Sequence, residues 1–171
     1  MLIGISGKKQ SGKDTSFPII QKILTNKGFF IKKYHFARYV KEFAELYFGI
    51  DQNPVNKEEV RFIWQGIGQL MREEVNKDFW VEKEYQAYLR DKEKSPNLIG
   101  IVTDVRYRNE ANFFVDKNFP LFRIYRSNYA IEDSHPSEVE LDDFTFDYYI
   151  DNSSSLDELE RKWKKLLTEI L

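Results

Sequence analysis

Hydrophobic and polar positions follow two different rhythms along this chain. Five short runs are rich in apolar, β-branched and aromatic residues, which is typical of buried strands. Between these runs, apolar residues return every three or four positions, as they do on one face of a helix. We therefore expect strands at 1–6, 29–35, 97–103, 119–125 and 145–150. We expect helices at 15–26, 37–48, 57–75, 78–92, 109–116 and 156–171.

The alternation of strands and helices predicts an α/β fold, with a five-stranded parallel sheet and helices on both faces. The stretch 37–94 has no convincing strand pattern, so we expect a helical insertion there, between the second and third strands. The polar, aperiodic stretch at about 126–143 is a candidate lid, because loops of such length are usually functional. With 171 residues, the chain is expected to form one domain, residues 1–171.

Composition narrows the chemistry and the partners. The 26 basic and 28 acidic residues give a net charge of -2, which argues against polymeric nucleic acid or a membrane surface as partner. The absence of Cys and the presence of only two His argue against thiol catalysis and the usual zinc sites. No secretory leader or apolar run near the ~20 residues of a membrane span appears, so we expect a cytoplasmic protein with small-molecule partners.

Residues 7–15, GKKQSGKDT, match the phosphate-binding pattern G-x-x-x-x-G-K, also called Walker A. An apolar strand precedes the loop and a helix follows it, so backbone N–H groups and the helix N-terminus can surround phosphates. The alternative is an ordinary glycine-rich turn before a helix. The residues assigned to nucleotide binding here are Gly7, Ser11, Gly12, Lys13, Asp14 and Thr15.

Asp14 stands where this pattern usually has Ser or Thr. A carboxylate cannot donate a hydrogen bond to a phosphate, so Thr15 is the expected hydroxyl near Mg²⁺. Asp14 is expected either to hold a metal-bound water, since Mg²⁺ usually keeps several waters, or to shape the loop.

A second cluster follows the third expected strand, which ends in Asp104-Val105-Arg106. Ligands collect beyond the carboxyl ends of parallel strands, so Asp104 and Arg106 should lie beside the phosphate loop. Asp104 would hold Mg²⁺, and Arg106 would bind an acceptor phosphate through two N–H groups. The alternative is that Asp104 caps the next helix while Arg106 pairs with Glu110.

Together these motifs resemble the bacteriophage-type deoxynucleoside monophosphate kinases, in the P-loop nucleoside monophosphate kinase group. The resemblance spans nearly the whole chain, although Arg108 stands where the family pattern has Pro. The matching segments are GKKQSGKDT at 7–15, HFARYVKE at 35–42, WQGIGQLMREEVNKDFWV at 64–81, TDVRYRNEA at 103–111, DSHPSEVELD at 133–142 and FDYYIDNSSSLDEL at 146–159.

The resemblance implies a three-layer P-loop NTPase fold and transfer of the γ-phosphoryl group of ATP, with Mg²⁺, to a (deoxy)nucleoside monophosphate. It implies that the insertion at 37–94 binds the acceptor, and that Arg72 and Arg106 hold the acceptor phosphate. For Arg72, the alternative is a solvated helix residue paired with Glu73 or Glu74. The resemblance also implies the cytoplasm of a bacterial cell or phage-infected host, and a homodimer is left open.

Further residues are hypotheses for substrate contacts. Trp64, Phe79 and Trp80 would form a stacking wall for the base, or they are core residues. Arg126 would contact ATP phosphates or adenine, as lid arginines do in related kinases. The remaining candidates for substrate contact are Lys41, Gln65, Gln69, Glu110, His135 and Glu138.

Two rival functions remain open. The first is a P-loop kinase for another small acceptor, such as dephospho-coenzyme A or phosphomevalonate; the segment 64–81 favours the nucleotide by resemblance. The second is a regulatory domain that binds ATP without chemistry, against which the joint presence of Lys13, Asp104, Arg72 and Arg106 argues. A GTPase is disfavoured, because the Asn-Lys pairs at Asn26 and Asn56 lack the Asp that guanine recognition requires two residues after the Lys.

Overall fold

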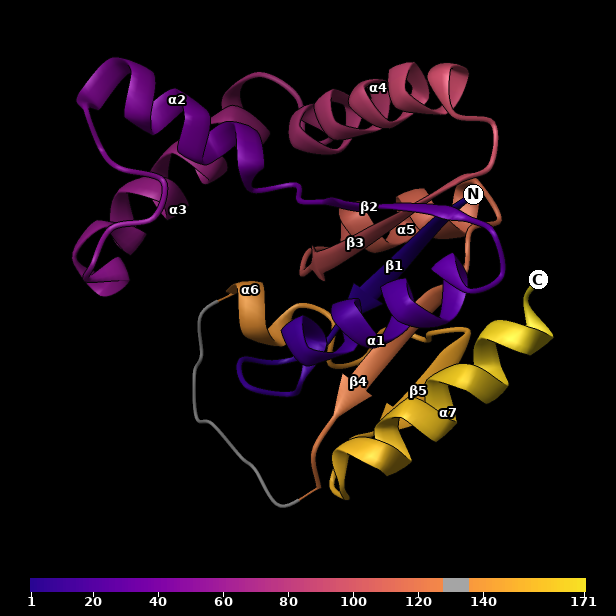
Figure 1. Ribbon diagram of the computed structural model, residues 1–171. Coiled ribbons are helices and arrows are strands. Elements are labelled where there is room, and N and C mark those ends of the chain that lie inside the picture. Colours follow the sequence, from indigo (N-terminus) through magenta and orange to yellow (C-terminus); the bar gives the residue numbers. More distant parts are fainter. Residues whose placement is uncertain (128–135) are drawn as a thin grey trace.

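Five parallel strands form one sheet in the order β2-β3-β1-β4-β5, with helices on both faces (Figure 1). The computed structural model describes residues 1–127 and 136–171. The predicted fold class, a three-layer α/β fold with a five-stranded parallel sheet and helices on both faces, is confirmed. The strands are β1 (Leu2–Ser6), β2 (Phe30–Tyr34), β3 (Leu98–Val105), β4 (Leu121–Tyr125) and β5 (Tyr148–Asp151).

The helices agree with the sequence pattern to within two residues at each end, with one addition. A short helix lies in the stretch that we expected to be an irregular loop, and the sequence prediction was wrong there. The helices are α1 (Lys13–Thr25), α2 (Arg38–Phe48), α3 (Lys57–Glu74), α4 (Phe79–Lys94), α5 (Arg108–Asp116), α6 (Pro136–Val139) and α7 (Leu156–Glu169).

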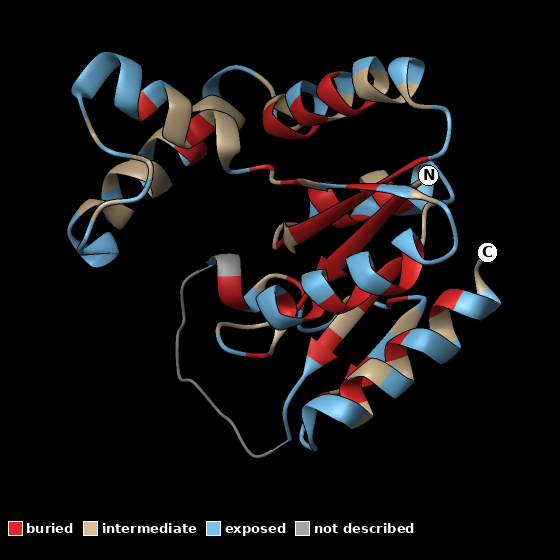
Figure 2. Cartoon of the chain, viewed as in Figure 1, coloured by how far each residue is buried: buried red, intermediate tan, exposed pale blue. Residues whose placement is uncertain are grey.

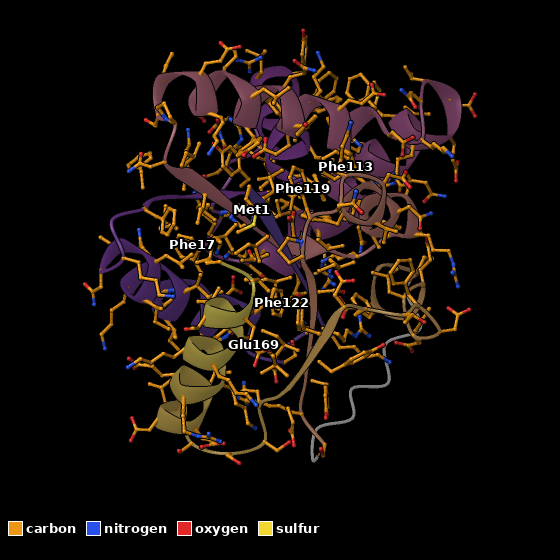
Figure 3. The ribbon with its side chains drawn as sticks, turned by 90° about the vertical axis from the view of Figure 1, so that its right-hand side faces the viewer. Met1, Phe17, Phe113, Phe119, Phe122 and Glu169 are labelled. Atoms are coloured by element: carbon orange, nitrogen blue, oxygen red, sulfur yellow. The ribbon has the colours of Figure 1, made fainter. Side chains whose placement is uncertain are left out.

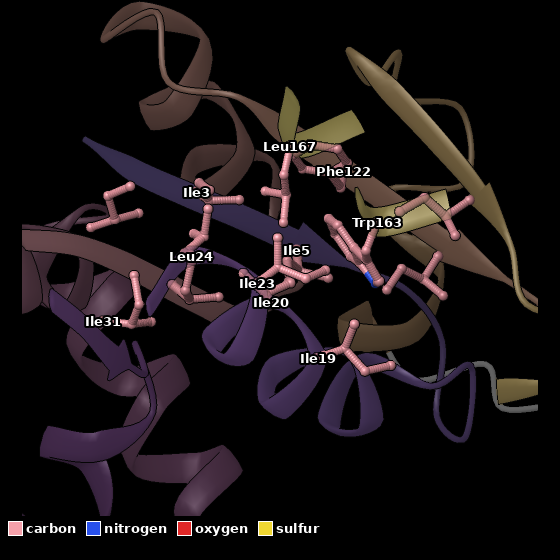
Figure 4. Packing of buried hydrophobic residues seen from close by; sticks show 14 of the residues in the cluster. Ile3, Ile5, Ile19, Ile20, Ile23, Leu24, Ile31, Phe122, Trp163 and Leu167 are labelled. Carbon is pink, nitrogen blue, oxygen red and sulfur yellow. The ribbon is translucent and has the colours of Figure 1, made fainter. Parts of the chain in front are cut away.

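Helices α1 and α7 cover one face of the sheet. Ile20 and Leu24 of α1 are fully buried against Ile3 of β1, and Trp163 of α7 packs against Phe122 of β4 (Figure 4). The apolar residues of both helices recur at helical spacing, so each helix presents one continuous apolar stripe to the sheet. This layer supports the strand and the helix between which the phosphate loop lies.

Helices α4 and α5 cover the opposite face. Phe113 of α5 packs edge-on against Tyr85 of α4 and Phe119 lies close by, whereas Phe122 lies on the α7 side of the sheet (Figure 3). Of the strands between these layers, β1 is buried along its whole length and β3 along nearly all of it (Figure 2). Strands buried in this way read as continuous apolar runs rather than alternating ones.

Helices α2 and α3 extend beyond the sheet edge beside α4 and are much more exposed than the central layers (Figure 2). The guanidinium of Arg38, at the start of α2, binds the carboxylate of Glu84 on α4 through Nη2 at 2.7 Å. The indole Nε1 of Trp80 on α4 donates to the carbonyl of Gly68 on α3 at 3.0 Å. These two contacts between polar groups fix the pair of helices against the rest of the fold.

In the part of the chain that the structure describes, no helix is long and apolar enough to cross a membrane. The division into a domain at 1–171, an insertion at 37–94 and a lid at 126–143 stays a prediction. Part of that predicted lid, residues 128–135, lies outside the described residues.

Candidate active site

The phosphate loop connects the carboxyl end of β1 to the first turn of α1. Gly12 has φ 104°, a conformation that L side chains rarely adopt, and a Cβ there would collide with the side-chain amide of Asn152. A Cβ at Gly7 would meet the backbone carbonyl of Ile124. Both predicted glycines are therefore required by the shape of the loop, and α1 begins directly after it.

Asn152 supports this loop and was missed by the sequence analysis. Its side chain is only 5% exposed, and Nδ2 donates to the carbonyl of Ser11 at 2.9 Å. Asn152 follows β5 directly, so its position at the carboxyl end of a strand was the available signal. The same reasoning had selected Asp104 at the end of the third strand.

Lys13 is 8% exposed and folds back over its own loop. Its Nζ donates to the carbonyl of Gly7 and, at 2.7 Å, to the carbonyl of Lys8. Burial, and then the nearby positive charge of Arg106, lowers the pKa of Lys13 to about 8. The ammonium group is thus held over the loop, at the place where a bound phosphate would meet backbone N–H groups.

Asp14 turns away from the loop interior. Its side chain is 90% exposed and pairs with Nζ of Lys33 on β2 at 3.2 Å. Thr15, the next residue, is exposed on the first turn of α1. Both residues remain candidates for the surroundings of a metal ion, and this assignment stays a prediction.

Asp104 binds the chain at the carboxyl end of β2. Its two carboxylate oxygens accept the backbone N–H groups of Phe36 at 3.1 Å and Ala37 at 3.0 Å. The alternative that Asp104 caps the helix following it is wrong, because these N–H groups precede α2 rather than α5. Asp104 therefore fixes the connection between β2 and α2. It also borders the cavity described below.

Arg106 makes contacts with two glutamates in different ways. Its backbone N–H donates to Oε2 of Glu110 at 2.7 Å, whereas its guanidinium pairs with Glu138 of α6. Glu110 also accepts the N–H of Tyr107 at 3.1 Å and so caps the first turn of α5. Burial, and then the negative charge of the nearby Asp104, raises the pKa of Glu110 to about 8. The alternative, in which Arg106 pairs with Glu110, holds only for the backbone N–H of Arg106 and not for its guanidinium.

A cavity of about 710 Å³ lies between the phosphate loop, the carboxyl ends of β2 and β3, and α3. Arg72 enters it from α3, with its guanidinium 4.0 Å from the ring centroid of Tyr107, and not paired with Glu73, which accepts from Gln69. The predicted site residues that line this cavity are Lys13, Asp14, Lys41, Trp64, Gln65, Arg72, Trp80, Asp104, Arg106 and Glu110.

The aromatic candidates differ in how they lie in this cavity. Nζ of Lys41 lies 4.7 Å from the ring centroid of Trp64, so one face of that indole already carries a cation. Burial, and then the charge of Lys57, lowers the pKa of Lys41. Trp80 is almost fully buried, which favours its interpretation as a core residue that only edges the cavity.

The remaining candidates lie outside this cavity. Arg126 borders a smaller hollow of about 100 Å³ together with Lys9 and Ser11 of the phosphate loop. Gln69 is exposed on α3. His135 lies outside the described residues.

The donor atoms available for a metal fit Mg²⁺ bound mainly through substrate phosphates. Among residues 1–127 and 136–171, no three His, Asp or Glu side chains gather closely enough to hold an ion by themselves. Asp14 and Asp104, two of the four carboxylate residues that line this cavity, border it together with Lys13. Mg²⁺ prefers oxygen ligands, keeps several waters and commonly takes only one or two carboxylates from the protein.

The sequence model of the family described as deoxynucleotide monophosphate kinase matches residues 47–163. A protein of Acanthamoeba polyphaga mimivirus, whose name assigns it provisionally to the deoxynucleotide monophosphate kinases, is 36% identical over 66 residues. That alignment covers 38% of this chain and 34% of the viral protein, so the match spans about a third of that relative's length.

Solved structures with a similar course of the chain include shikimate kinase from Aquifex aeolicus, with a TM-score of 0.48 and 15% identity. The comparison covers 99% of this chain and 96% of that one. The APS kinase of Mycobacterium tuberculosis gives a TM-score of 0.47 and 11% identity, over 98% of this chain and 96% of that one.

Proposed function

The chain belongs to the deoxynucleotide monophosphate kinase family, and from this we propose that it transfers the γ-phosphoryl group of ATP to a (deoxy)nucleoside monophosphate. An oxygen of the acceptor phosphate attacks Pγ, the bond from Pγ to the bridging oxygen breaks, and ADP leaves with that electron pair. The products are ADP and the nucleoside diphosphate. The whole reaction needs two phosphate-binding sites within bonding distance of each other.

One observation carries the proposal: the phosphate loop and two arginines that could hold a second phosphate border the same cavity. Lys13 lies on the loop side of this cavity, and Arg72 and Arg106 lie on the side of α3 and the end of β3. A domain that binds ATP without chemistry would need only the phosphate loop and Lys13, and not the two arginines. Two guanidinium groups converging beside the loop suit a dianionic acceptor that presents several oxygens.

The side chains act by positioning and by neutralising charge, since phosphoryl transfer requires little covalent help from the protein. Lys13 stabilises the phosphoryl group in transit, and Arg72 and Arg106 align the acceptor phosphate. No strong general base is required, because an acceptor phosphate oxygen is already anionic at neutral pH. Arg126, beside the loop, contacts the ATP phosphates or the adenine.

Asp104, Asp14 and the hydroxyl of Thr15 are the residues that would hold Mg²⁺ and its waters. When bound, the ion would neutralise charge on the β- and γ-phosphoryl oxygens. The segment from α2 to α4 would bind the nucleoside, with Trp64 as the stacking surface, Gln65 or Gln69 at the base edge and Trp80 behind.

The test is an assay of ADP release with ATP and each of the four deoxynucleoside monophosphates, the ribonucleotides, dephospho-coenzyme A and phosphomevalonate. Lys13→Ala should abolish transfer while leaving the circular dichroism spectrum unchanged. Lys22→Ala is the matched control, because Lys22 lies on the same helix but its side chain is exposed and pairs with Glu160. Activity with one of the non-nucleotide acceptors alone would replace the proposal, and ATP binding without turnover of any acceptor would favour the non-catalytic alternative.

A further inference from the structure

The carboxylate of Glu138 links two parts of the site that are distant in sequence. One oxygen, Oε2, accepts the backbone N–H of Lys9 in the phosphate loop at 2.8 Å. The other, Oε1, pairs with Nη1 of Arg106, just beyond the carboxyl end of β3. The Glu138 side chain is only 3% exposed. A single buried carboxylate therefore touches both the loop expected to bind ATP and the arginine expected to bind the acceptor.

A carboxylate buried to this degree is costly unless it is fully paired, so its partners determine where it can lie. Here both oxygens have strong donors, one a backbone N–H and the other a guanidinium. The arrangement fixes the guanidinium in turn, because a planar group held at one Nη by a buried partner loses much of its freedom to rotate. The side chain of Glu138 thus fixes the position of the Arg106 guanidinium relative to the backbone of Lys9.

The contact leaves Arg106 able to bind a substrate. Within the described part of the chain, only Nη1 of its guanidinium is engaged, and the side chain borders the cavity that also holds Lys13 and Arg72. The N–H groups on Nε and Nη2 remain for an acceptor oxygen. A side chain that binds substrate is commonly oriented in this way by a second residue, which takes one of its hydrogen-bond donors and leaves the other donors for the substrate.

We propose that Glu138 is a positioning residue, which holds the acceptor-binding guanidinium of Arg106 at a fixed distance from the phosphate loop. The inference rests on the proposed function. In-line transfer depends on the relative position of the donor and acceptor phosphates, and an error of about 1 Å can cost about 100-fold in rate. Glu138 acts on the reaction through Arg106 and does not touch the reacting atoms.

A double-mutant cycle tests this dependence. Glu138→Gln, which keeps the shape and removes the charge, should lower kcat/KM for the acceptor by about 10-fold to 100-fold. In an Arg106→Ala background the same change should have an effect of less than about twofold, because the residue through which it acts is gone. Glu138→Asp should recover part of the loss. A full effect of Glu138→Gln in the Arg106→Ala background would overturn the proposal.

A second outcome would also overturn it. If the carboxylate only fills a position that a phosphate takes over, Glu138→Gln should bind ATP more tightly and turn over as fast as the wild type or faster. Calorimetric titration with ATP and with a deoxynucleoside monophosphate separates the two readings, because positioning weakens acceptor binding and leaves ATP affinity within about twofold.

The matched control is Asp143→Asn. Asp143 pairs with Arg108 and its side chain is 75% exposed, so the substitution removes another arginine–carboxylate contact between the same two stretches of chain, but one that lies on the surface. It should leave kcat and KM unchanged. If the wild-type protein neither bound nor phosphorylated any nucleotide, the proposed function would fail; if the wild type were active and Glu138→Gln equalled it, only the positioning role would fail.

Discussion

The guanidinium of Arg72 lies over the ring of Tyr107, 4.0 Å from its centroid. Arg72 is in the last turn of α3 and Tyr107 directly precedes α5, so the stack connects the exposed helical pair to the edge of the sheet. A cation over an aromatic face in a partly buried place contributes about 1 kcal/mol. Its role would be to hold Arg72 in place for the acceptor phosphate.

Replacing the ring should therefore weaken acceptor binding. Tyr107→Leu should raise KM for the acceptor about fivefold, which corresponds to that 1 kcal/mol, with a smaller effect on KM for ATP. Tyr107→Phe keeps the aromatic face and should stay within about twofold of the wild type. Initial rates over a range of acceptor concentrations measure both. Equal losses in the two variants would show that the hydroxyl, and not the ring, matters.

Asn152 should matter for both stability and ATP binding. Asn152→Ala removes the donor to the buried carbonyl of Ser11, so we expect the free energy of unfolding to fall by about 1–3 kcal/mol. The phosphate loop would be less well held, and KM for ATP should rise. Urea denaturation and steady-state kinetics measure the two effects. Ser154→Ala, at an exposed position two residues further along the chain, should change the stability by no more than about 0.5 kcal/mol.

Glu110 should make the stability depend on pH. Its pKa in the folded chain, about 8, lies above the ordinary value of 4.5, so between these values the folded chain keeps a proton that the unfolded chain has lost. The contribution of Glu110 is thus fully present below pH 4.5 and declines as the pH rises towards 8, by at most about 1.4 kcal/mol per pH unit.

Glu110→Gln stays neutral at every pH and can still accept the N–H groups of Arg106 and Tyr107. Denaturant titrations from pH 5 to pH 8.5 should show a smaller loss of stability for this variant than for the wild type. Glu93→Gln, on the exposed side of α4, should keep the wild-type pH dependence. The prediction would be wrong if Glu110→Gln and the wild type lost stability in parallel.

Arg38 should hold α2 against α4. Arg38→Met leaves the carboxylate of Glu84, which is 2% exposed, without its cationic partner, and we expect a loss of about 2–3 kcal/mol in the free energy of unfolding. Arg161→Met breaks the pair with Glu158 on the exposed face of α7 and should cost less than about 0.5 kcal/mol. Similar losses in both variants would contradict a special role for the buried carboxylate.

The sheet and its helices could be predicted because each element carries its own pattern. β1 and β3 are apolar runs bounded by polar turns, and the residues of α7 repeat at helical spacing after Ser155, whose hydroxyl accepts the N–H of Glu158. The phosphate loop was recognisable because all its residues are contiguous. Signals of this local kind do not depend on how the strands are ordered in space.

The contacts that complete the site could not be predicted in the same way. Glu138 reaches Lys9 and Arg106 only because α6 lies over the ends of β1 and β3, and the polar composition of its segment predicted a loop. Asn152 reaches the backbone carbonyl of Ser11 because β1 and β5 run parallel with only β4 between them, so that both residues lie beyond the carboxyl ends of their strands. Pairings over such distances follow from the strand order, which the sequence pattern does not contain.

The central place of β1 has a consequence for synthesis on the ribosome. This strand emerges first among the five, yet both of its neighbours, β3 and β4, belong to the second half of the chain. Until they are made, an apolar strand and the apolar face of α1 have no sheet to join, and long-range pairing of this kind slows folding. The nascent chain should therefore bind a chaperone until β4 has emerged, and truncation before β3 should yield a chain that aggregates.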